Sequence, residues 1–435
     1  MKIGLAGYNV DTEHGSSTPE TISAAYARIS RDPRPVEALR KEAAGEVERA
    51  RDSNRRIVFG YGHGSVAEHA FFNFDVMGLS RLVTEALQSF RLASFTEKSQ
   101  RYVDLGRDWV VPQELPDDLK DEWKEELEGL FGLYRRASSH LKESGLPGER
   151  AREDARYLLP LAVCGQMGMS MNARELEHAV RRLAAHPLAE ARELSERLLA
   201  SASAAAPSLL RYLNPVEMDR FAWRLPPAPE PEAEEVVLVR ADGDEVVGAR
   251  LLQYRKGISL EGAREAWNLL EPRRRRQLFE EVMTGLGAHD AVPRDWELAG
   301  FTFQLFISAT AYAQLKRHRM STQLPSDYSP RLGLRVPPSF EENGIAEMVG
   351  EAAEAHRRWR DRLPGQLAAY MLTNAHRRSV VVRMNGRELY HFSRLRMDSH
   401  AQWDIRQLAG RMVGLAVDRA PLTLSSVGGK SQLED

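Results

Sequence analysis

The sequence contains very little cysteine. Cys164 is the only one in 435 residues, which excludes a disulfide framework and a cysteine-rich zinc site within one chain. Apolar runs are short as well, because none approaches the roughly 20 residues that a membrane span requires. The opening residues, MKIGLAGYNVDTEHG, lack the long apolar core of a signal peptide. We therefore expect a cytoplasmic protein with no membrane partner and no bound metal.

An excess of charge of either sign is also lacking. The 60 lysines and arginines nearly balance the 62 aspartates and glutamates, so no overall positive field favours nucleic acid as a partner. Hydrophobic residues make up 43% and charged residues 28% of the chain, which is typical of a globular protein. The length exceeds what one ordinary core holds and predicts two domains.

One segment divides the chain. RLPPAPEPEAEE, residues 224–235, is rich in proline and glutamate and has no apolar period, which is typical of an extended linker. It separates two predicted domains, residues 1–223 and 236–435.

These two halves resemble each other. NARELEHAVRRL, from Asn172, and NGRELYHFSRLR, from Asn385, share Asn-x-Arg-Glu-Leu-x-His in the same register. Upstream, AYARIS is similar to GARLLQ, and AEHAFFNF is similar to WELAGFTF, in the same order. Three matches in one order indicate a tandem duplication.

Apolar spacing predicts the main elements. Residues 118–145 carry apolar side chains at helical spacing, with Gly145 as a stop. AFFNFDVMG and GFTFQLFIS predict strands, each passing into a helix, and EVVLVRADG predicts a strand that opens the second half. The Arg-His-Arg cluster, residues 317–319, should then lie at a helix end, before a loop with Pro325 and Pro330.

Two segments carry the candidate chemistry. The second half holds QLKRHRMSTQLPSDYSPR, from Gln314 to Arg331. Arginine offers paired donors to phosphate and a flat face for stacking, although a solvated basic patch at a helix C-terminus would look the same. The first half holds SFRLASFTEKSQRYV, from Ser89, preceded by GHGSVAEHA. Gly and Ser suggest a loop between His63 and His69, for which a metal site and a purely structural role are alternatives.

In combination these segments resemble one family. GHGSVAEHA, SFTEKSQRYV, QLKRHR and LYHFSRLRMDSHAQWDIRQLA are similar to the flavin-dependent thymidylate synthases, whose signature is R-H-R-x-x-S-x-N-x-x-S-x-R. The resemblance covers most of both halves. It implies an α+β fold, with two tandem repeats that each contain a mixed or antiparallel sheet and long helices.

The resemblance also implies the chemistry. FAD would be the cofactor, NADPH the reductant and methylenetetrahydrofolate the one-carbon donor, and dUMP would be methylated to dTMP. Known members are homotetramers, so two tandem chains would form a homodimer that imitates the tetramer.

Site residues implied by the resemblance are divided between the halves. In the family, one subunit supplies a Gln-x-x-Arg-His-Arg segment and a late arginine, and its partner supplies a Glu-x-Ser-x-Arg segment and another arginine. The second half retains the first set as Gln314 and Arg317 for dUMP, with Arg396 as the catalytic group, whose charge near N3 would favour the deprotonated uracil ring. The first half retains the complementary dUMP set, namely Glu97, Lys98, Ser99, Gln100, Arg101 and Arg156.

Flavin contacts would come from both halves. The implied set comprises His63, Ser65, Glu97, Arg317, His318 and Arg319, together with both copies of Asn-x-Arg-x3-His, namely Asn172, Arg174 and His178, and Asn385, Arg387 and His391. The sequence leaves open which copy faces the flavin.

Each half has lost what the other keeps. The first half has Ser89 and Phe90 in place of Arg-His, and Leu183 in place of the late arginine. The second half has Ala369 in place of Arg156, and PSDYSPR carries either a proline at the glutamate position or a two-residue insertion. Complementary losses predict one composite site, formed within a chain or across the dimer.

One departure from the signature keeps other functions open. Thr96 stands where the signature has asparagine. A hydroxymethylase or methylase of another pyrimidine nucleotide, and a non-catalytic remnant that binds flavin or nucleotide, are therefore alternatives.

Overall fold

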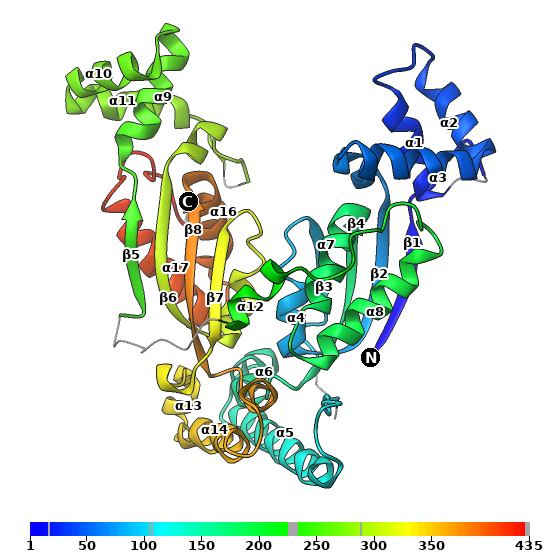
Figure 1. Cartoon of the computed structure of the whole chain (residues 1–435). Coiled ribbons are helices and arrows are strands. Elements are labelled where there is room, and N and C mark those ends of the chain that lie inside the picture. The colour runs from blue at the N-terminus through cyan, green and yellow to red at the C-terminus, as the bar shows by residue number, and fades with distance from the viewer. Residues whose placement is uncertain (16–17, 104–105, 107, 225–233, 288, 431–435) are drawn as a thin grey trace. The chain divides into compact units, whose positions relative to one another are not determined.

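The computed structural model describes residues 1–435 except 16–17, 104–105, 107, 225–233, 288 and 431–435 (Figure 1). The chain forms two compact units: unit 1 is Met1–Ala228 with Pro338–Thr373, and unit 2 is Pro229–Pro337 with Asn374–Asp435. Most of the predicted linker, residues 225–233, lies outside the described residues. Among the described helices, none combines the length and the apolar character that crossing a membrane demands.

Unit 1 is built on an antiparallel sheet of order β1-β2-β4-β3. Its strands are β1 Lys2–Tyr8, β2 Phe71–Ser80, β3 Ala93–Glu97 and β4 Cys164–Asn172. In β2 the side chains of Phe72, Phe74 and Val76 are buried and those between them are exposed, because successive side chains of a strand point to opposite faces. This alternation confirms the predicted strand.

The first repeat also contributes helices to unit 1. The α-helices are α1 Pro19–Arg28, α2 Val36–Gly45, α3 Val47–Asn54, α4 Arg81–Leu87, α5 Lys120–Glu143, α6 Gly148–Ala155, α7 Ala173–Ala184 and α8 Ala189–Ser203. Shorter turns are the π-helix η1 Arg55–Gly60 and the 3-10 helices η2 Gly64–His69, η3 Asp117–Leu119, η4 Arg156–Leu158 and η5 Glu217–Arg224. Helix α5 confirms the prediction for residues 118–145, with Gly145 just beyond its end at a φ of 94°. The loop predicted between His63 and His69 is instead the 3-10 helix η2.

Unit 2 repeats the plan, with an antiparallel sheet of order β5-β6-β8-β7. The strands are β5 Val236–Ala241, β6 Gly300–Ser308, β7 Thr322–Tyr328 and β8 Arg377–Asn385. Its helices are α9 Asp244–Lys256, α10 Leu260–Leu269, α11 Pro272–Met283, η6 Arg294–Leu298, α12 Ala309–Leu315, η7 Pro330–Leu332, α16 Gly386–Arg396 and α17 Trp403–Val417. Strands β5 and β6 and the helix α12 confirm the predicted elements.

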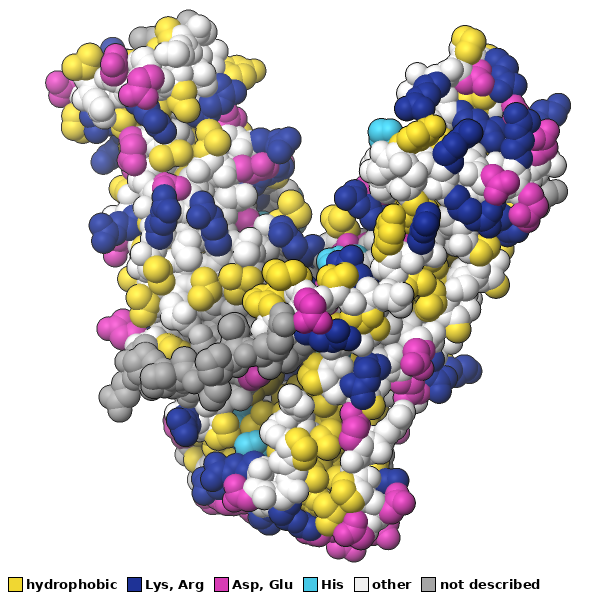
Figure 2. Space-filling view, viewed as in Figure 1, with side chains coloured by type: hydrophobic (Ala, Val, Ile, Leu, Met, Phe, Trp, Pro, Cys, Tyr) yellow, Lys and Arg dark blue, Asp and Glu magenta, His cyan; other side chains and the backbone are white. Residues whose placement is uncertain are grey.

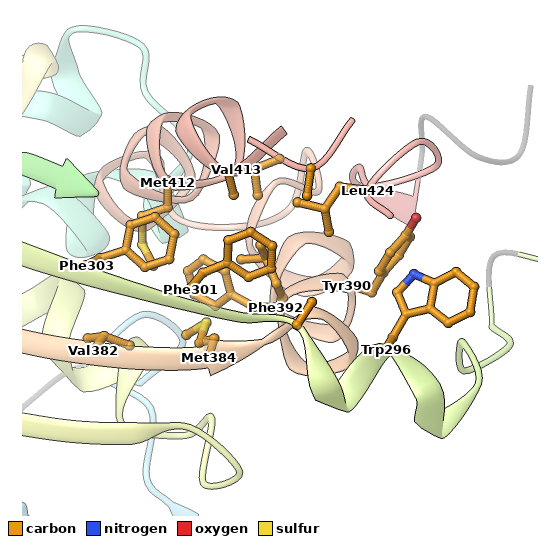
Figure 3. Packing of buried hydrophobic residues seen from close by; sticks show 14 of the residues in the cluster. Trp296, Phe301, Phe303, Val382, Met384, Tyr390, Phe392, Met412, Val413 and Leu424 are labelled. Carbon is orange, nitrogen blue, oxygen red and sulfur yellow. The ribbon is translucent and has the colours of Figure 1, made fainter. Parts of the chain in front are cut away.

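The core of unit 2 lies between its sheet and α16 and α17 (Figure 3). Phe301 and Phe303 of β6 and Met384 of β8 pack toward Phe392 of α16 and Met412 of α17. All five side chains are buried. Burying each such side chain stabilises the fold by about 1.5–3 kcal/mol, so the helix that carries Arg396 is firmly attached to the sheet.

One predicted loop is wrong. The segment around Pro325 is the edge strand β7, which pairs with β8 from Thr322 to Tyr328. Proline has no N–H to donate, but an edge strand leaves one side of its backbone unpaired and tolerates it. The register shifts between Pro325 and Tyr328, and Pro330 lies beyond the strand, at the start of η7.

Strand registers confirm the duplication. Phe71 of β2 pairs with Asn172 of β4, and Gly300 of β6 pairs with Asn385 of β8. Strands β4 and β8 each contain nine residues and end at these asparagines. The two asparagines are therefore equivalent positions in the two repeats.

A segment of the second repeat belongs to unit 1. It contains α13 Pro338–Glu342, α14 Glu347–Arg360, α15 Gly365–Ala368 and η8 Ala369–Met371. The ring of Trp359 lies 5.0 Å from that of Trp123 in α5, and Leu161 N donates to Leu372 O at 2.7 Å. The compact units and the sequence repeats are thus different divisions of the chain.

Candidate functional site

Helix α12 carries the Arg-His-Arg cluster to the edge of its sheet. Ser308 ends β6, and its hydroxyl accepts from Ala311 N at 3.0 Å, which caps the helix. The helix ends at Leu315 and residues 317–319 form the turn into β7. The predicted position of the cluster at a helix end is therefore confirmed. Within the same helix, Gln314 Nε2 donates to Gln402 Oε1 at 3.3 Å.

His318 of this cluster forms a hydrogen-bonded series with two side chains of α16, Glu388 and Arg396. His318 is buried, and its Nδ1 lies 3.2 Å from Glu388 Oε1. Arg396 Nε donates to His318 Nε2 at 3.0 Å. Burial lowers the pKa of His318, and the hydrogen bond with Glu388 opposes this. The structure thus joins Arg396 to His318, which the sequence assigned to different ligands.

Two guanidinium groups lie close together at this point. Burial, followed by the charge of Arg317, lowers the pKa of Arg396 to about 10. Within the described part of the chain, neither Arg317 nor Arg396 forms an ion pair with a carboxylate. Neighbouring cations without a counter-charge repel each other, and an anion placed between them relieves that repulsion. The arrangement is suited to binding an anionic ligand.

The second Asn-x-Arg-x3-His copy faces a cavity of about 320 Å³. Asn385 caps α16 by accepting from Glu388 N at 2.8 Å, and Arg387 pairs with Glu297 at 2.9 Å. The ring of His391 lies 5.5 Å from that of His318. All three residues of this copy line the cavity.

The first copy is built in the same way. Asn172 caps α7 by accepting from Glu175 N at 2.8 Å, and Arg174 pairs with Glu68 of η2. Glu68 of unit 1 thus has the role that Glu297 has in unit 2. The ring of His178 packs against Phe90 at 5.4 Å, where the second copy has His318.

The GHGS segment lies beside the first copy. A Cβ added at Gly64 would lie 3.5 Å from Arg174 Nε. His63 and Ser65, which flank this glycine, are exposed. The structure therefore places these two predicted flavin residues on either side of a glycine that lies against Arg174.

The predicted nucleotide segment follows β3. Gln88 Nε2 donates to Glu97 Oε2 at 3.2 Å, Lys98 N donates to Gln166 O at 2.9 Å, and Ser99 Oγ accepts from Arg101 N at 3.1 Å. Gln100 is half-buried between these contacts.

Arg101 and Arg156 meet at one buried carboxylate, Glu153 of α6. Arg101 forms ion pairs with Glu153 and, at 3.0 Å, with Glu149. Burial raises the pKa of Glu153, and the charges of Arg156 and then Arg101 oppose this. Burial also lowers the pKa of Arg156. Sequence reasoning missed Glu153, although its place one helical turn before Arg156 was a usable signal.

Strand register identifies the residue that replaces Glu97. Glu97 pairs with Met167, five residues before Asn172, and Pro325 pairs with Val380, five residues before Asn385. Proline therefore occupies the glutamate position in the second repeat, and an insertion, if any, lies after it. Similarly, Arg156 begins η4 and Ala369 begins η8, each eight residues before β4 or β8 starts.

A larger cavity of about 710 Å³ lies among α1, α2, α3 and η1. Three of its arginines, Arg28, Arg34 and Arg49, pair with the single carboxylate of Glu42. Dark-blue cationic and magenta acidic side chains alternate over this region (Figure 2). Sequence reasoning did not single out this cavity, because its arginines follow no motif. Its carboxylates make it a weaker anion site than the pair Arg317 and Arg396.

Cys164 is half-buried in β4. Burial is the main cause that raises the pKa of its thiol to about 12. A thiol in that state is a poor nucleophile at neutral pH.

The chain is similar to proteins of one family. The profile of the family described as thymidylate synthase complementing protein matches residues 13–208 and 242–422. A flavin-dependent thymidylate synthase of Pyrococcus abyssi is 39% identical over 128 residues, which cover 28% of this chain and 49% of that protein, so the chain spans about half of that relative's length. A UPF0159 protein of Thermoplasma acidophilum is 23% identical over 449 residues, covering 89% of this chain and 90% of that protein. A crystal structure of ThyX from Helicobacter pylori, a flavin-dependent thymidylate synthase complexed with FAD and dUMP, matches 48% of this chain and 100% of that chain, with a TM-score of 0.36 and 19% identity.

Proposed function

Because the chain belongs to the family of flavin-dependent thymidylate synthases and contains its domain twice, we propose that it methylates dUMP to dTMP. The observation that carries this proposal is the pair Arg317 and Arg396, two neighbouring guanidiniums without a carboxylate partner among the described residues. Such a pair favours an anionic ligand such as a nucleotide.

We assign the dUMP contacts to residues of both repeats. Arg317 and Gln314 come from the second repeat. Arg101 and Arg156 come from the first, where the structure brings them together beside Glu153. The other predicted contacts of the first repeat, Glu97, Lys98, Ser99 and Gln100, lie between β3 and Arg101. Each repeat holds only part of the set, so the proposed site is composite, within one chain or across two.

Arg396 is the proposed catalytic group. Its Nε is held by His318, which leaves both terminal nitrogens of the guanidinium for the uracil ring. With a pKa of about 10 it stays charged at neutral pH. A fixed cation beside N3 favours the deprotonated ring and stabilises the negative charge that develops when C5 becomes a nucleophile.

The residues also fit a flavin. Asn385, Arg387 and His391 line a cavity whose wall also includes the apolar side chains of Val292 and Met320. A flavin has both an apolar ring system and polar edges, and we propose that this second copy, together with Arg317, His318 and Arg319, holds FAD. His63, Ser65, Glu97 and the first copy, Asn172, Arg174 and His178, supply the remaining predicted contacts. Bound FAD would transfer hydride from NADPH to the one-carbon unit of methylenetetrahydrofolate. No cysteine nucleophile is needed, which suits the raised pKa of Cys164.

One experiment tests this function. The purified protein is examined for a flavin absorbance band and then incubated with dUMP, NADPH and methylenetetrahydrofolate, and the product is identified by mass spectrometry. We expect dTMP. A hydroxymethylated nucleotide, or turnover of another pyrimidine, would favour the related enzyme, and a flavin band without turnover would favour the non-catalytic remnant. The homodimer and the cytoplasmic location stay predictions.

A further inference from the structure

The first turn of helix α16 contains a glutamate that has an unusual partner. Glu388 is the third residue after the cap Asn385. A glutamate at this position ordinarily reaches back to the backbone N–H of the capping residue. The Glu388 carboxylate is instead 7% exposed and lies 3.2 Å from His318 Nδ1.

The hydrogen bonds of His318 fix the position of its proton. A guanidinium nitrogen can only donate, so His318 Nε2, which receives Arg396 Nε at 3.0 Å, must be the acceptor. A neutral imidazole then carries its proton on Nδ1, and this proton is donated to Glu388. The direction of the series is therefore set: Arg396 donates to His318, which donates to Glu388.

The first repeat provides an internal comparison. Glu175 holds the same position after Asn172 and is also 7% exposed. Its carboxylate accepts from Leu92 N at 3.1 Å and lies 3.7 Å from His178. Phe90 and Leu183 stand at the places of His318 and Arg396. The series exists only in the repeat that keeps the catalytic arginine.

We propose that Glu388 is a positioning residue that holds Arg396 through His318. The carboxylate selects the Nδ1-protonated tautomer of His318, and that tautomer gives Arg396 Nε its acceptor. Since the side chain of Arg396 has several rotatable bonds, a fixed Nε restricts where its terminal nitrogens meet the base. The expected effect on turnover rests on the proposed function. The effect on the His318 tautomer does not.

Three variants test the effect on turnover. Glu388→Leu removes the acceptor, Glu388→Gln keeps a neutral acceptor, and Glu175→Leu is the matched control in the first repeat. Because a hydrogen bond to a buried charged group is lost, we expect Glu388→Leu to lower kcat by about 10- to 100-fold with flavin still bound. Glu388→Gln should recover part of this loss, and the control should stay within about twofold of the wild type. Wild-type kcat in Glu388→Leu would overturn the proposal.

A spectroscopic measurement tests the tautomer without turnover. In flavin-loaded protein labelled with ¹⁵N-histidine, His318 resonances are assigned from their absence in His318→Gln. We expect a protonated Nδ1 in the wild type and in Glu175→Leu, and a mixture of tautomers in Glu388→Leu. If the leucine variant does not fold, Glu388→Gln decides, because loss of the negative charge should move the Nδ1 proton resonance upfield. An unchanged resonance would contradict the proposal, whereas a wild type that makes no dTMP but shows the expected tautomers would contradict only the proposed function.

Discussion

If one dUMP site is built from both repeats, the loss of an arginine from either repeat should weaken dUMP binding at that site. Arg317→Ala removes an exposed guanidinium that has no carboxylate partner among the described residues. Its removal therefore leaves no acidic group uncompensated, and the change in affinity reports on the ligand alone. A hydrogen bond to a charged group contributes about 1.5–3 kcal/mol, so we expect the dUMP dissociation constant to rise by about 10- to 150-fold.

Arg101→Ala makes the matching change in the first repeat. The loss of affinity should be similar, because the contact has the same chemistry. Here, however, Glu153 is fully buried and loses one of its cations, while Arg156 and Arg150 remain. We therefore also expect the free energy of unfolding to fall by about 1–3 kcal/mol, which Arg317→Ala should not show.

Calorimetric titration of flavin-loaded protein with dUMP measures both effects. The wild type should bind one dUMP per chain, and each variant should keep this stoichiometry with a weaker dissociation constant. Arg411→Ala is the control, because its guanidinium is half-exposed and pairs with Glu235. Two equal dUMP sites per chain in the wild type, or an unchanged dissociation constant in Arg101→Ala, would refute the composite site.

Three further outcomes follow from the structure. Arg396→Ala should keep the flavin band but lose most dTMP formation in the turnover assay, and near-normal turnover would remove its catalytic assignment. Burial lowers the pKa of His356 to about 4, so below about pH 6.5 the unfolded state binds a proton that the folded state does not. The contribution of His356 to stability should therefore fall by up to about 3 kcal/mol from pH 7 to pH 4. In denaturant titrations His356→Gln, unlike the exposed His400→Gln, should make the pH dependence less steep, and the part that remains includes His186, whose pKa burial also lowers to about 4. Trp359→Ala should cost about 3–5 kcal/mol in the same titrations, against less than about 1 kcal/mol for the exposed Arg358→Ala; a small effect of Trp359→Ala would show that α14 is not part of the core of unit 1.

The sequence predicted those elements whose apolar spacing is local. In β2 every second side chain along most of the strand is buried, and in α5 the buried side chains recur at helical spacing. Both patterns can be recognised from neighbouring residues in the sequence. The wrong prediction of a loop at Pro325 also came from reading the sequence locally. A proline excludes a central strand, but the sequence alone does not say that β7 is an edge.

The local sequence pattern could not predict which helix α14 packs against. Its buried face shows that the helix packs against something, yet nothing in its spacing selects α5 of the other repeat. For the candidate site, sequence motifs named Arg317, His318 and Arg396. They missed Glu388, because a glutamate in the first turn of a helix is interpreted as part of the helix cap. They missed Glu153, because a glutamate within a helix is interpreted as a solvent-exposed charge until its buried partner is known.

The crossing of the segment Pro338–Thr373 into unit 1 has an evolutionary consequence. A gene that lost its second half would leave the surface of α5 around Trp123 without Trp359, and a gene that lost its first half would produce α14 without that surface. Either truncated product would expose apolar side chains that favour aggregation. Reversion to a single-copy gene would thus be selected against even if every ligand contact were restored. The packing of α14 against α5 therefore makes the tandem duplication difficult to lose.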